Sequence, residues 1–420
     1  PLPNPPLRYA QGRGAENPAH TRKGGSNAGP RQPVLPPYSG TTLPSDTTGT
    51  AMPLFKFTRH GGQARGSQPH SPLPWIALIA LILGAVALGF AWLAGWIGRD
   101  RLTAQNFTDA IEATGANHPG FRRAHSKGVC VNGWFEPNVQ APQLSHARVF
   151  EQARVPVLGR LSIGGGNPHG ADNNARVRSI ALQLSSDDGQ QWRMAMNSFP
   201  FLAVATPEAF YEQTRAQIPD PATGKPDPAK QAAIQEKYPS ARAFTQWAKT
   251  APWTDSWAST EFNSVNSFWF TNAQGQRRAV RWRWQPQATP RELDAATREQ
   301  AGVDFLSQDL QQRLAQGPVR WNLVVTLAST QDAINDPSVP WPAEREQVTA
   351  GVLTIERMQP QEQGSCNDLN FDPLILPEGV EGSDDPILAA RSAVYSQSFN
   401  RRERERATGE AARDNAQVQP

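Results

Sequence analysis

The chain has 420 residues, enough for one large domain or two domains of ordinary size. Its net charge of +3 is too small to predict a nucleic-acid partner. Its two cysteines, Cys130 and Cys366, occur without a CxxC or CxxCH motif, which excludes a disulfide framework, a zinc ribbon and covalent attachment of a c-type haem.

The first 72 residues predict a disordered segment. They are rich in Pro, Gly, Ser, Thr and Asn, and their apolar residues follow no helical or strand period. The first methionine is Met52, and the basic residues Lys56, Arg59 and Arg65 follow it. We expect the natural protein to start at Met52.

An uncharged apolar run at residues 75–97 predicts a membrane anchor over residues 73–98. About 20 apolar residues cross a bilayer as a helix, and Trp75, Trp92 and Trp96 fit the aromatic belts at its surfaces. A cleavable signal peptide has an apolar core of roughly 7–15 residues, and a buried core helix is seldom so apolar, so we favour an uncleaved anchor. The basic residues before the run predict a single-pass inner-membrane protein with a cytoplasmic N-terminus and a periplasmic domain.

Strand and helix patterns alternate after the anchor. Period-two alternation and turn residues predict strands at residues 125–135, 155–163, 176–186, 190–199, 263–286, 319–329 and 350–358. Helical patterns occupy residues 102–115, 207–250 with a loop at 219–229, 290–316 and 385–399. Ser383 or Asp384 is the expected N-cap of the last helix. The pattern predicts one α+β domain at residues 103–405 with an antiparallel sheet or barrel, followed by a polar disordered tail at 406–420.

Short motifs indicate little chemistry by themselves. The sequence has no HExxH and no GxSxG, so zinc-protease and α/β-hydrolase readings lack support. The glycine-rich run at residues 162–170 matches neither GxGxxG nor GxxxxGK and predicts a turn. His125, in RRAHSKG on a predicted strand, would most simply be structural.

Arg391 and Tyr395 are four residues apart and share one face of the predicted last helix. A guanidinium beside a phenol favours the ionised phenolate. A phenolate is a hard anionic ligand suited to ferric iron, and Tyr is the axial haem ligand of catalase. RxxxY alone is too common to predict a function.

Residues far upstream make this pair more specific. In chain order the sequence contains Arg122-x-x-His125-x-Lys127-Gly128, Arg160-x-Ser162, Arg178, Asn197 and Arg391-x-x-x-Tyr395. This order resembles the haem catalase superfamily, and residues 366–395 are similar to its small branch, the catalase-related peroxidases. The resemblance covers roughly residues 103–405. It implies a catalase-like fold, in which helices surround an antiparallel eight-stranded β-barrel and haem is bound.

The resemblance also implies roles for individual residues. The cofactor would be haem b, with Tyr395 as the axial ligand of its iron and Arg391 beside the phenol. His125 and Asn197 would be catalytic, because a neutral imidazole can move the proton of a peroxide and an amide can donate a hydrogen bond to it.

Five further positions are implied as haem-binding. Arg122, Arg160 and Arg402 would hold the haem propionates and the proximal side of the ring. Ser162 would bond to the distal histidine, and Phe210, or alternatively Phe201, would pack on the distal ring face.

The implied function is a haem-dependent peroxidase that reduces hydrogen peroxide, organic peroxides or both through a ferryl intermediate. A short segment before the barrel and a chain that ends soon after Arg402 favour a wider channel, and larger peroxides, than in large catalases. Alternatives are a true catalase, a fatty-acid hydroperoxide isomerase and a non-catalytic tethered haem-binding module. The electron donor is unknown, and the anchor suggests a membrane cytochrome or quinol.

Cys130 and Cys366 could pair in an oxidising compartment. Cys130 follows His125 in a predicted strand, however, and we expect it to pack as a small buried apolar residue instead.

Overall fold

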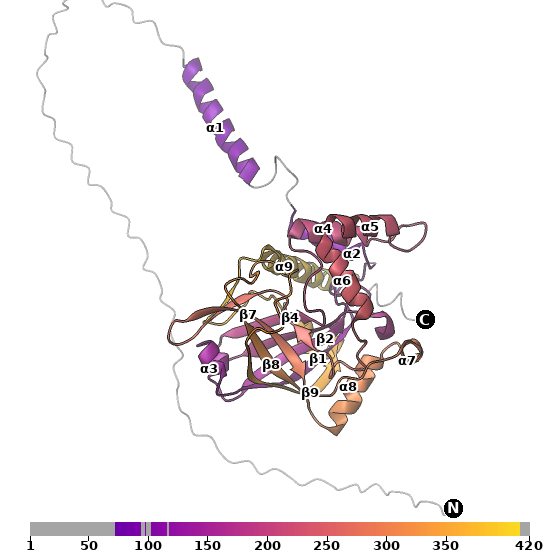
Figure 1. Ribbon diagram of the computed structural model, residues 1–420. Coiled ribbons are helices and arrows are strands. Elements are labelled where there is room, and N and C mark those ends of the chain that lie inside the picture. The colour runs from indigo at the N-terminus through magenta and orange to yellow at the C-terminus, as the bar shows by residue number, and fades with distance from the viewer. Residues whose placement is uncertain (1–71, 94–96, 98–101, 116, 412–420) are drawn as a thin grey trace, which may run out of the picture. The chain divides into compact units, whose positions relative to one another are not determined.

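The computed structural model describes residues 72–93, 97, 102–115 and 117–411 (Figure 1). The predicted disordered segment lies outside the described residues except for its last residue, and so does the expected start at Met52. Of the predicted tail, residues 412–420 also lie outside them.

The predicted anchor forms one helix, α1 (Leu73–Leu93). Its stretch Leu73–Trp92 is long and apolar enough to cross a membrane, and none of it is buried against protein. The length and composition fit a membrane span and a signal sequence alike.

Ten strands of the described chain form one antiparallel sheet. Their bounds are β1 (Gly128–Pro137), β2 (Val155–Ile163), β3 (Arg178–Ser185), β4 (Gln191–Asn197), β5 (Phe262–Asn263), β6 (Phe268–Thr271), β7 (Arg277–Pro286), β8 (Val319–Leu327), β9 (Gln347–Pro360) and β10 (Val380–Gly382). The order is β10-β6-β7-β5-β4-β3-β2-β1-β9-β8, and β7 also pairs with β8. This extra pairing closes eight strands into a barrel and leaves β6 and β10 outside it, as the catalase-like fold predicts.

Large aromatic side chains fill the inside of the barrel. Trp282 and Trp284 on β7 point inward and are buried, and Trp282 packs edge-to-face on Trp192 with ring centroids 5.1 Å apart. Trp284 packs in the same way on Phe135, with centroids 5.8 Å apart. Such pairs add about 0.5–1.5 kcal/mol each to the free energy of burial. Because side chains fill the core, a large ligand must bind outside the barrel.

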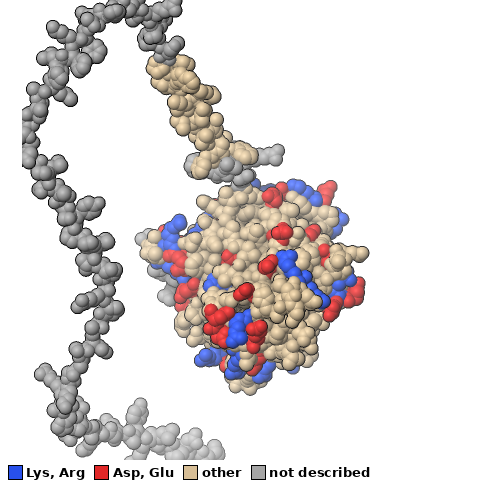
Figure 2. Space-filling view, turned by 90° about the vertical axis from the view of Figure 1, so that its left-hand side faces the viewer, with Lys and Arg blue, Asp and Glu red and all other residues tan. Residues whose placement is uncertain are grey.

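Helices surround the barrel. Their bounds are α2 (Ala104–Glu112), α3 (Ala141–Leu144), α4 (Pro207–Ala216), α5 (Pro228–Lys237), α6 (Pro239–Thr250), α7 (Ala295–Gln300), α8 (Phe305–Gln316) and α9 (Pro386–Ala407). In Figure 1, α2, α4, α5 and α6 group together at one end of the barrel, where α2 and α4 also contact α9. On the face shown in Figure 2, acidic and basic residues of the domain are interspersed, so this face presents no single-sign field that would attract a polyanion.

Helix α9 begins and ends later than predicted. Its N-cap is Asp385, whose Oδ1 accepts a hydrogen bond from the Ile387 amide at 2.8 Å, and not Ser383 or Asp384. It continues beyond Phe399 to Ala407, so the first residues of the predicted tail are helical. The sequence after Phe399 is charged and lacks an apolar period, yet tertiary contacts bury Arg402 and Glu405.

Buried ion pairs connect the end of α9 to the segment before the barrel. Arg123 pairs with Glu405, and its Nε also donates to Glu112 of α2 at 2.8 Å. Glu405 Oε2 accepts a hydrogen bond from the Gly120 amide at 2.8 Å. Arg401 of α9 pairs with Glu112 at 2.8 Å. These contacts hold α2 and α9 together as two adjacent walls.

Cys130 and Cys366 form a disulfide, contrary to the expectation that Cys130 would only pack. Both residues are buried and lie 236 positions apart in the sequence. A cross-link across so long a loop restricts the unfolded chain, and in the chain-entropy account this stabilises the fold by roughly 5 kcal/mol. The sequence pattern could not show the pairing, because only the tertiary fold brings residue 366 beside β1.

Candidate active site

A cavity of about 260 Å³ is lined by the outer face of the barrel and by α2, α4 and α9. Side chains alternate along a strand, so residues two apart share a face. Ser179 on β3 and Ala195 and Asn197 on β4 line the cavity, whereas Leu182 and Met194 belong to the core. The cavity therefore lies against the outside of the barrel wall.

One face of α9 forms another wall of the cavity. Residues three or four apart lie on the same helix face. The stripe consists of Ile387, Ala390, Arg391, Val394, Tyr395, Ser398, Phe399 and Arg402. The predicted ligand Tyr395 and the predicted haem-binding residues Arg391 and Arg402 thus come to one cavity from a single helix.

His125 lines the same cavity. The sequence predicted that it lies on a strand, and this prediction is wrong. It occupies a bend before β1 and has a left-handed backbone conformation with φ 55°. A non-glycine residue in this conformation costs of order 1–3 kcal/mol and persists where its surroundings fix it. The neighbouring Ser126 amide donates to Gly165 O at 3.0 Å and helps to hold this bend.

A hydrogen-bonded chain joins His125 to Asn197 through Ser179. Ser179 Oγ lies 3.0 Å from His125 Nδ1 and 2.6 Å from Asn197 Oδ1. The hydroxyl has one proton, which it donates to the amide oxygen of Asn197. In its contact with His125, Ser179 Oγ must therefore accept a hydrogen bond from a protonated Nδ1. This assignment leaves Nε2 of His125 as the unprotonated nitrogen and the Nδ2 group of Asn197 as a donor.

The predicted role of Ser162 belongs to Ser179. Ser162 is buried and lines the cavity, but the hydroxyl that bonds to His125 is that of Ser179, its register partner on the next strand. The hairpin between β3 and β4 places Ser179 directly opposite Asn197. Only the register between β2 and β3 distinguishes the two serines.

The imidazole of His125 stays neutral over most of the pH range. Burial, followed by the positive charges of Arg160 and Arg391, lowers its pKa to about 4, against the opposing effect of the Ile163 carbonyl. A neutral imidazole with a free Nε2 can accept a proton.

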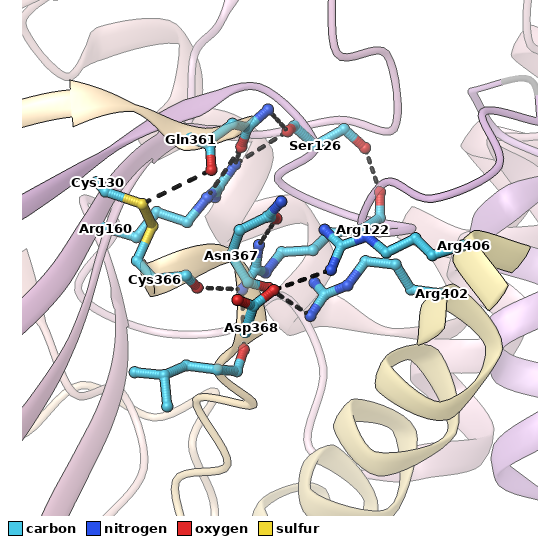
Figure 3. Close-up of a disulfide and its surroundings, with 11 residues drawn as sticks. Arg122, Ser126, Cys130, Arg160, Gln361, Cys366, Asn367, Asp368, Arg402 and Arg406 are labelled. Carbon is cyan, nitrogen blue, oxygen red and sulfur yellow. Dashed lines mark hydrogen bonds and ion pairs between the residues drawn. A yellow bond between two sulfur atoms is a disulfide. The ribbon is translucent and has the colours of Figure 1, made fainter. Parts of the chain in front are cut away.

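Arg122, Arg160 and Arg402 converge at one edge of the cavity (Figure 3). Burial lowers the pKa of all three, and repulsion from neighbouring arginines lowers it further, to about 9 for Arg160 and about 10 for Arg402. A Cβ on Gly128 would lie 2.4 Å from Leu161 O and 2.7 Å from Nη2 of Arg160, so only glycine fits beside the β2 backbone and this guanidinium.

The surroundings of Arg122 and Arg160 are suited to an apolar ligand that carries carboxylates. Within the described residues, no carboxylate forms an ion pair with Arg122 or Arg160, whose hydrogen bonds go to backbone carbonyls and amide side chains. Buried guanidinium groups without a counter-charge are suited to bind anions. Because the adjoining walls carry Ile111, Val394 and Phe399, the cavity suits the apolar ring and two propionates of haem.

Arg391 is positioned by a network that sequence reasoning missed. Its Nη1 donates to Asn266 Oδ1 and its Nη2 donates to Ala195 O at 2.6 Å. Asn266 Nδ2 in turn donates to Asp385 Oδ2 at 2.6 Å. The guanidinium carbon then lies 5.9 Å from the ring centroid of Tyr395. Asn266 has no signal in the sequence, because it lies more than a hundred residues before α9.

The two phenylalanine alternatives separate in the structure. Phe210 on α4 lines the cavity and packs on Phe107 of α2 with centroids 6.4 Å apart. Phe201 packs on Phe244, with centroids 6.2 Å apart. Phe199, two residues before Phe201, lines the cavity, although the sequence analysis did not select it.

Comparisons with known proteins agree with this geometry. The catalase family model matches residues 97–407. The chain is 37% identical over 331 residues to a catalase-related peroxidase of Synechococcus elongatus, covering 78% of this chain and 96% of the relative. It is 33% identical over 304 residues to a catalase-related peroxidase of Mycolicibacterium paratuberculosis, covering 72% and 95%. To the longer catalase of Sus scrofa it is 24% identical, covering 70% of this chain and 59% of that protein.

Solved structures share the fold. Catalase A from Saccharomyces cerevisiae matches with a TM-score of 0.62 at 18% identity, covering 68% of this chain and 62% of that chain. A fungal catalase matches with a TM-score of 0.60 at 20% identity, covering 67% and 59%.

The low pKa of His125 predicts a pH-dependent stability of the haem-free protein. The unfolded histidine titrates near 6.5 and the folded one at about 4, so between these values the unfolded chain binds the extra proton. This contribution to stability is complete above pH 6.5 and is lost as the pH falls through 4, by roughly 3 kcal/mol in total.

We therefore expect wild type to lose more free energy of unfolding than His125→Gln between pH 7 and pH 4. Urea unfolding of both proteins across this range measures the difference, because all other groups titrate in both. Parallel curves would contradict the low pKa.

Proposed function

Because this chain belongs to the catalase family, we propose that it is a haem-dependent peroxidase that reduces hydrogen peroxide and organic peroxides. The observation that carries the proposal is the chain His125–Ser179–Asn197, which shares one cavity with Tyr395 and with Arg122 and Arg160. Neither of these two arginines forms an ion pair with a carboxylate of the described residues. Relatives named catalase-related peroxidase align over 95–96% of their length, whereas pig catalase aligns over 59% of its length. This difference favours a peroxidase over a large catalase.

Particular side chains would hold haem b. Tyr395 would ligate the iron, and Arg391 lies beside the phenol, with its guanidinium carbon 5.9 Å from the ring centroid. Arg122, Arg160 and Arg402 would bind the propionates. Phe210 lies where an aromatic ring could pack on the haem. When bound, haem would supply a redox-active iron that passes two electrons from the donor to the peroxide.

The residues of the barrel wall would move the proton of the peroxide. His125 Nε2 would accept the proton from one peroxide oxygen and return it to the other, which leaves as water or as an alcohol when the O–O bond breaks. The remaining oxygen would leave as water once two electrons from the donor and two protons have been supplied. Ser179 fixes the tautomer that leaves Nε2 free. Asn197 Nδ2 donates a hydrogen bond to the peroxide without competing for its proton.

A true catalase is the second candidate, because full-length catalases share the fold. The two activities differ in the source of the electrons. A catalase takes them from a second hydrogen peroxide and releases oxygen, whereas a peroxidase takes them from another donor.

Removing the hydroxyl of Tyr395 should remove the iron ligand. We expect Tyr395→Phe to lose or strongly shift the ferric haem absorption bands, because phenylalanine has no donor atom for iron. The matched control is Tyr238→Phe, which removes a hydroxyl that donates to Glu212 at 2.9 Å and lies outside the cavity lining. An unchanged spectrum in Tyr395→Phe would rule out this ligand.

Replacing the proton-moving residue should slow turnover and preserve haem. We expect His125→Ala to lower kcat/KM for peroxide by about 10²–10⁴, and Asn197→Ala to lower it by about 10²–10³. His146→Ala, outside the cavity lining, serves as the control.

Donor oxidation and oxygen release should be followed together, with hydrogen peroxide and with an alkyl hydroperoxide. Oxygen release as the main product would identify a catalase, and rearrangement of a lipid hydroperoxide without donor oxidation would identify an isomerase. Unaltered turnover in His125→Ala would exclude the proposed proton transfer.

We further propose that α1 anchors the domain in the inner membrane and that the domain lies in the periplasm. The buried disulfide supports an oxidising compartment, because such bonds seldom persist in the cytosol. A membrane-bound donor, such as a quinol or a cytochrome, would then be close to the enzyme.

This topology predicts the behaviour of two reporter fusions. A reporter that is active only in the periplasm should be active when fused after Ala407 and inactive when fused before α1. The product should also resist extraction by alkaline carbonate. Release of a shortened soluble protein would show that α1 is a cleaved signal. Activity of the fusion before α1, with no activity of the fusion after Ala407, would reverse the topology.

A further inference from the structure

Residues 361–369, here called the arginine-binding segment, hold all three arginines of the cavity edge. Arg122 Nη2 donates to Cys366 O at 3.0 Å and to Leu369 O at 2.9 Å. Arg402 Nη2 donates to Asn367 O at 2.7 Å, and Arg160 Nη2 donates to Gln361 Oε1 at 2.6 Å. Figure 3 shows Arg160 of β2, Arg402 of α9 and Arg122 of the segment before β1 converging on the arginine-binding segment.

The arginine-binding segment holds together three guanidinium groups that repel one another. Arg160 and Arg402 each lower the pKa of Arg122, which shows that the positive charges act on one another. The carbonyl and amide oxygens of the segment stabilise the guanidinium groups at this spacing. Its own regular structure is limited to two short 3-10 turns, η3 (Gln361–Gln363) and η4 (Ser365–Asp368), so local hydrogen bonds alone hold it weakly.

The disulfide fixes the segment to the barrel. Cys366 lies in η4 and is bonded to Cys130 of β1, a strand that is paired on both sides. The cysteine that forms the bond also supplies a carbonyl to Arg122. A Cβ on Gly364 would lie 2.4 Å from Cys130 Sγ, so the segment can approach the barrel this closely only with glycine there.

We propose that the Cys130–Cys366 disulfide is a positioning element of the ligand site. By fixing the arginine-binding segment to β1, it holds Arg122 and Arg402 where they bind the carboxylates of haem, and it thereby slows the release of haem. Both cysteines are buried, so the bond is a permanent structural link and not a surface switch. This inference rests on the proposed function, because it requires haem in the cavity.

A purely structural cross-link would have a different signature. It would stabilise the fold regardless of Arg122, so its removal would accelerate haem loss by the same factor whether or not Arg122 is present. A positioning element acts through the arginine. Once Arg122 is absent, removing the disulfide should therefore change the rate of haem loss very little.

The experiment is a double-mutant cycle on the full-length holoprotein in detergent. The disulfide is removed by Cys130→Ala with Cys366→Ala, and haem dissociation is followed by transfer to an excess of a haem-scavenging apoprotein. We expect dissociation to become about tenfold faster or more in the Arg122-containing protein. In an Arg122→Ala background, the same change should alter the rate by less than about twofold.

Two further variants separate position from cross-linking. Gly364→Ala keeps the disulfide but forces the segment away from Cys130, and we expect it also to accelerate haem loss. Arg148→Ala is the matched control background, because Arg148 lies outside the cavity lining and pairs with Asp187. In the Arg148→Ala background, removing the disulfide should accelerate haem dissociation as much as it does in the wild type.

The outcomes are distinguishable. A wild type that retains no haem would refute the proposed function itself. Retained haem with rates unchanged by both the cysteine and Gly364 variants, or accelerated equally with and without Arg122, would refute only the positioning role. Gly364→Ala keeps the test valid if the cysteine variant does not fold.

Discussion

The buried polar contacts that hold α9 against the barrel are the constraint on which the rest of the site depends. Near the start of the helix, Asp385 accepts a hydrogen bond from Asn266, and near its end Glu405 pairs with Arg123. Separating a buried pair would leave a charged group unpaired in a low dielectric, so neither end moves easily. The stripe that carries Tyr395 is therefore held at a fixed distance from the wall that carries His125 and Asn197.

Positive charge gives the cavity two properties at once. Burial lowers the pKa of His125 most, and the charges of Arg160, Arg391 and Arg122 also lower it, so the imidazole stays neutral and able to accept a proton. The same charges attract an anionic ligand, because no carboxylate of the described residues neutralises Arg122 or Arg160. A ligand that carries carboxylates would offset the repulsion among these guanidinium groups, so ligand binding and the stability of this region are coupled.

Where residue type and order carried the information, sequence reasoning selected residues that the structure brings to one cavity. The family resemblance, the antiparallel barrel and the helix carrying Arg391 and Tyr395 are confirmed. It was wrong where the answer depended on the pairing of strands or on a bend. Ser162 and Ser179 are register partners and look alike in the sequence, and His125 occupies a left-handed bend that the alternating pattern around it conceals.

The sequence by itself determined the periodicities that form the elements, the apolar length of α1 and the order of the residues that carry the chemistry. Each of these properties is local or depends only on the order of residues along the chain. The tertiary structure alone decided that Ser179 bonds to His125, that Asn266 holds Arg391 and that Cys130 pairs with Cys366. Such contacts join residues that are far apart in the sequence, and they form only after barrel closure and strand register have brought the partners together.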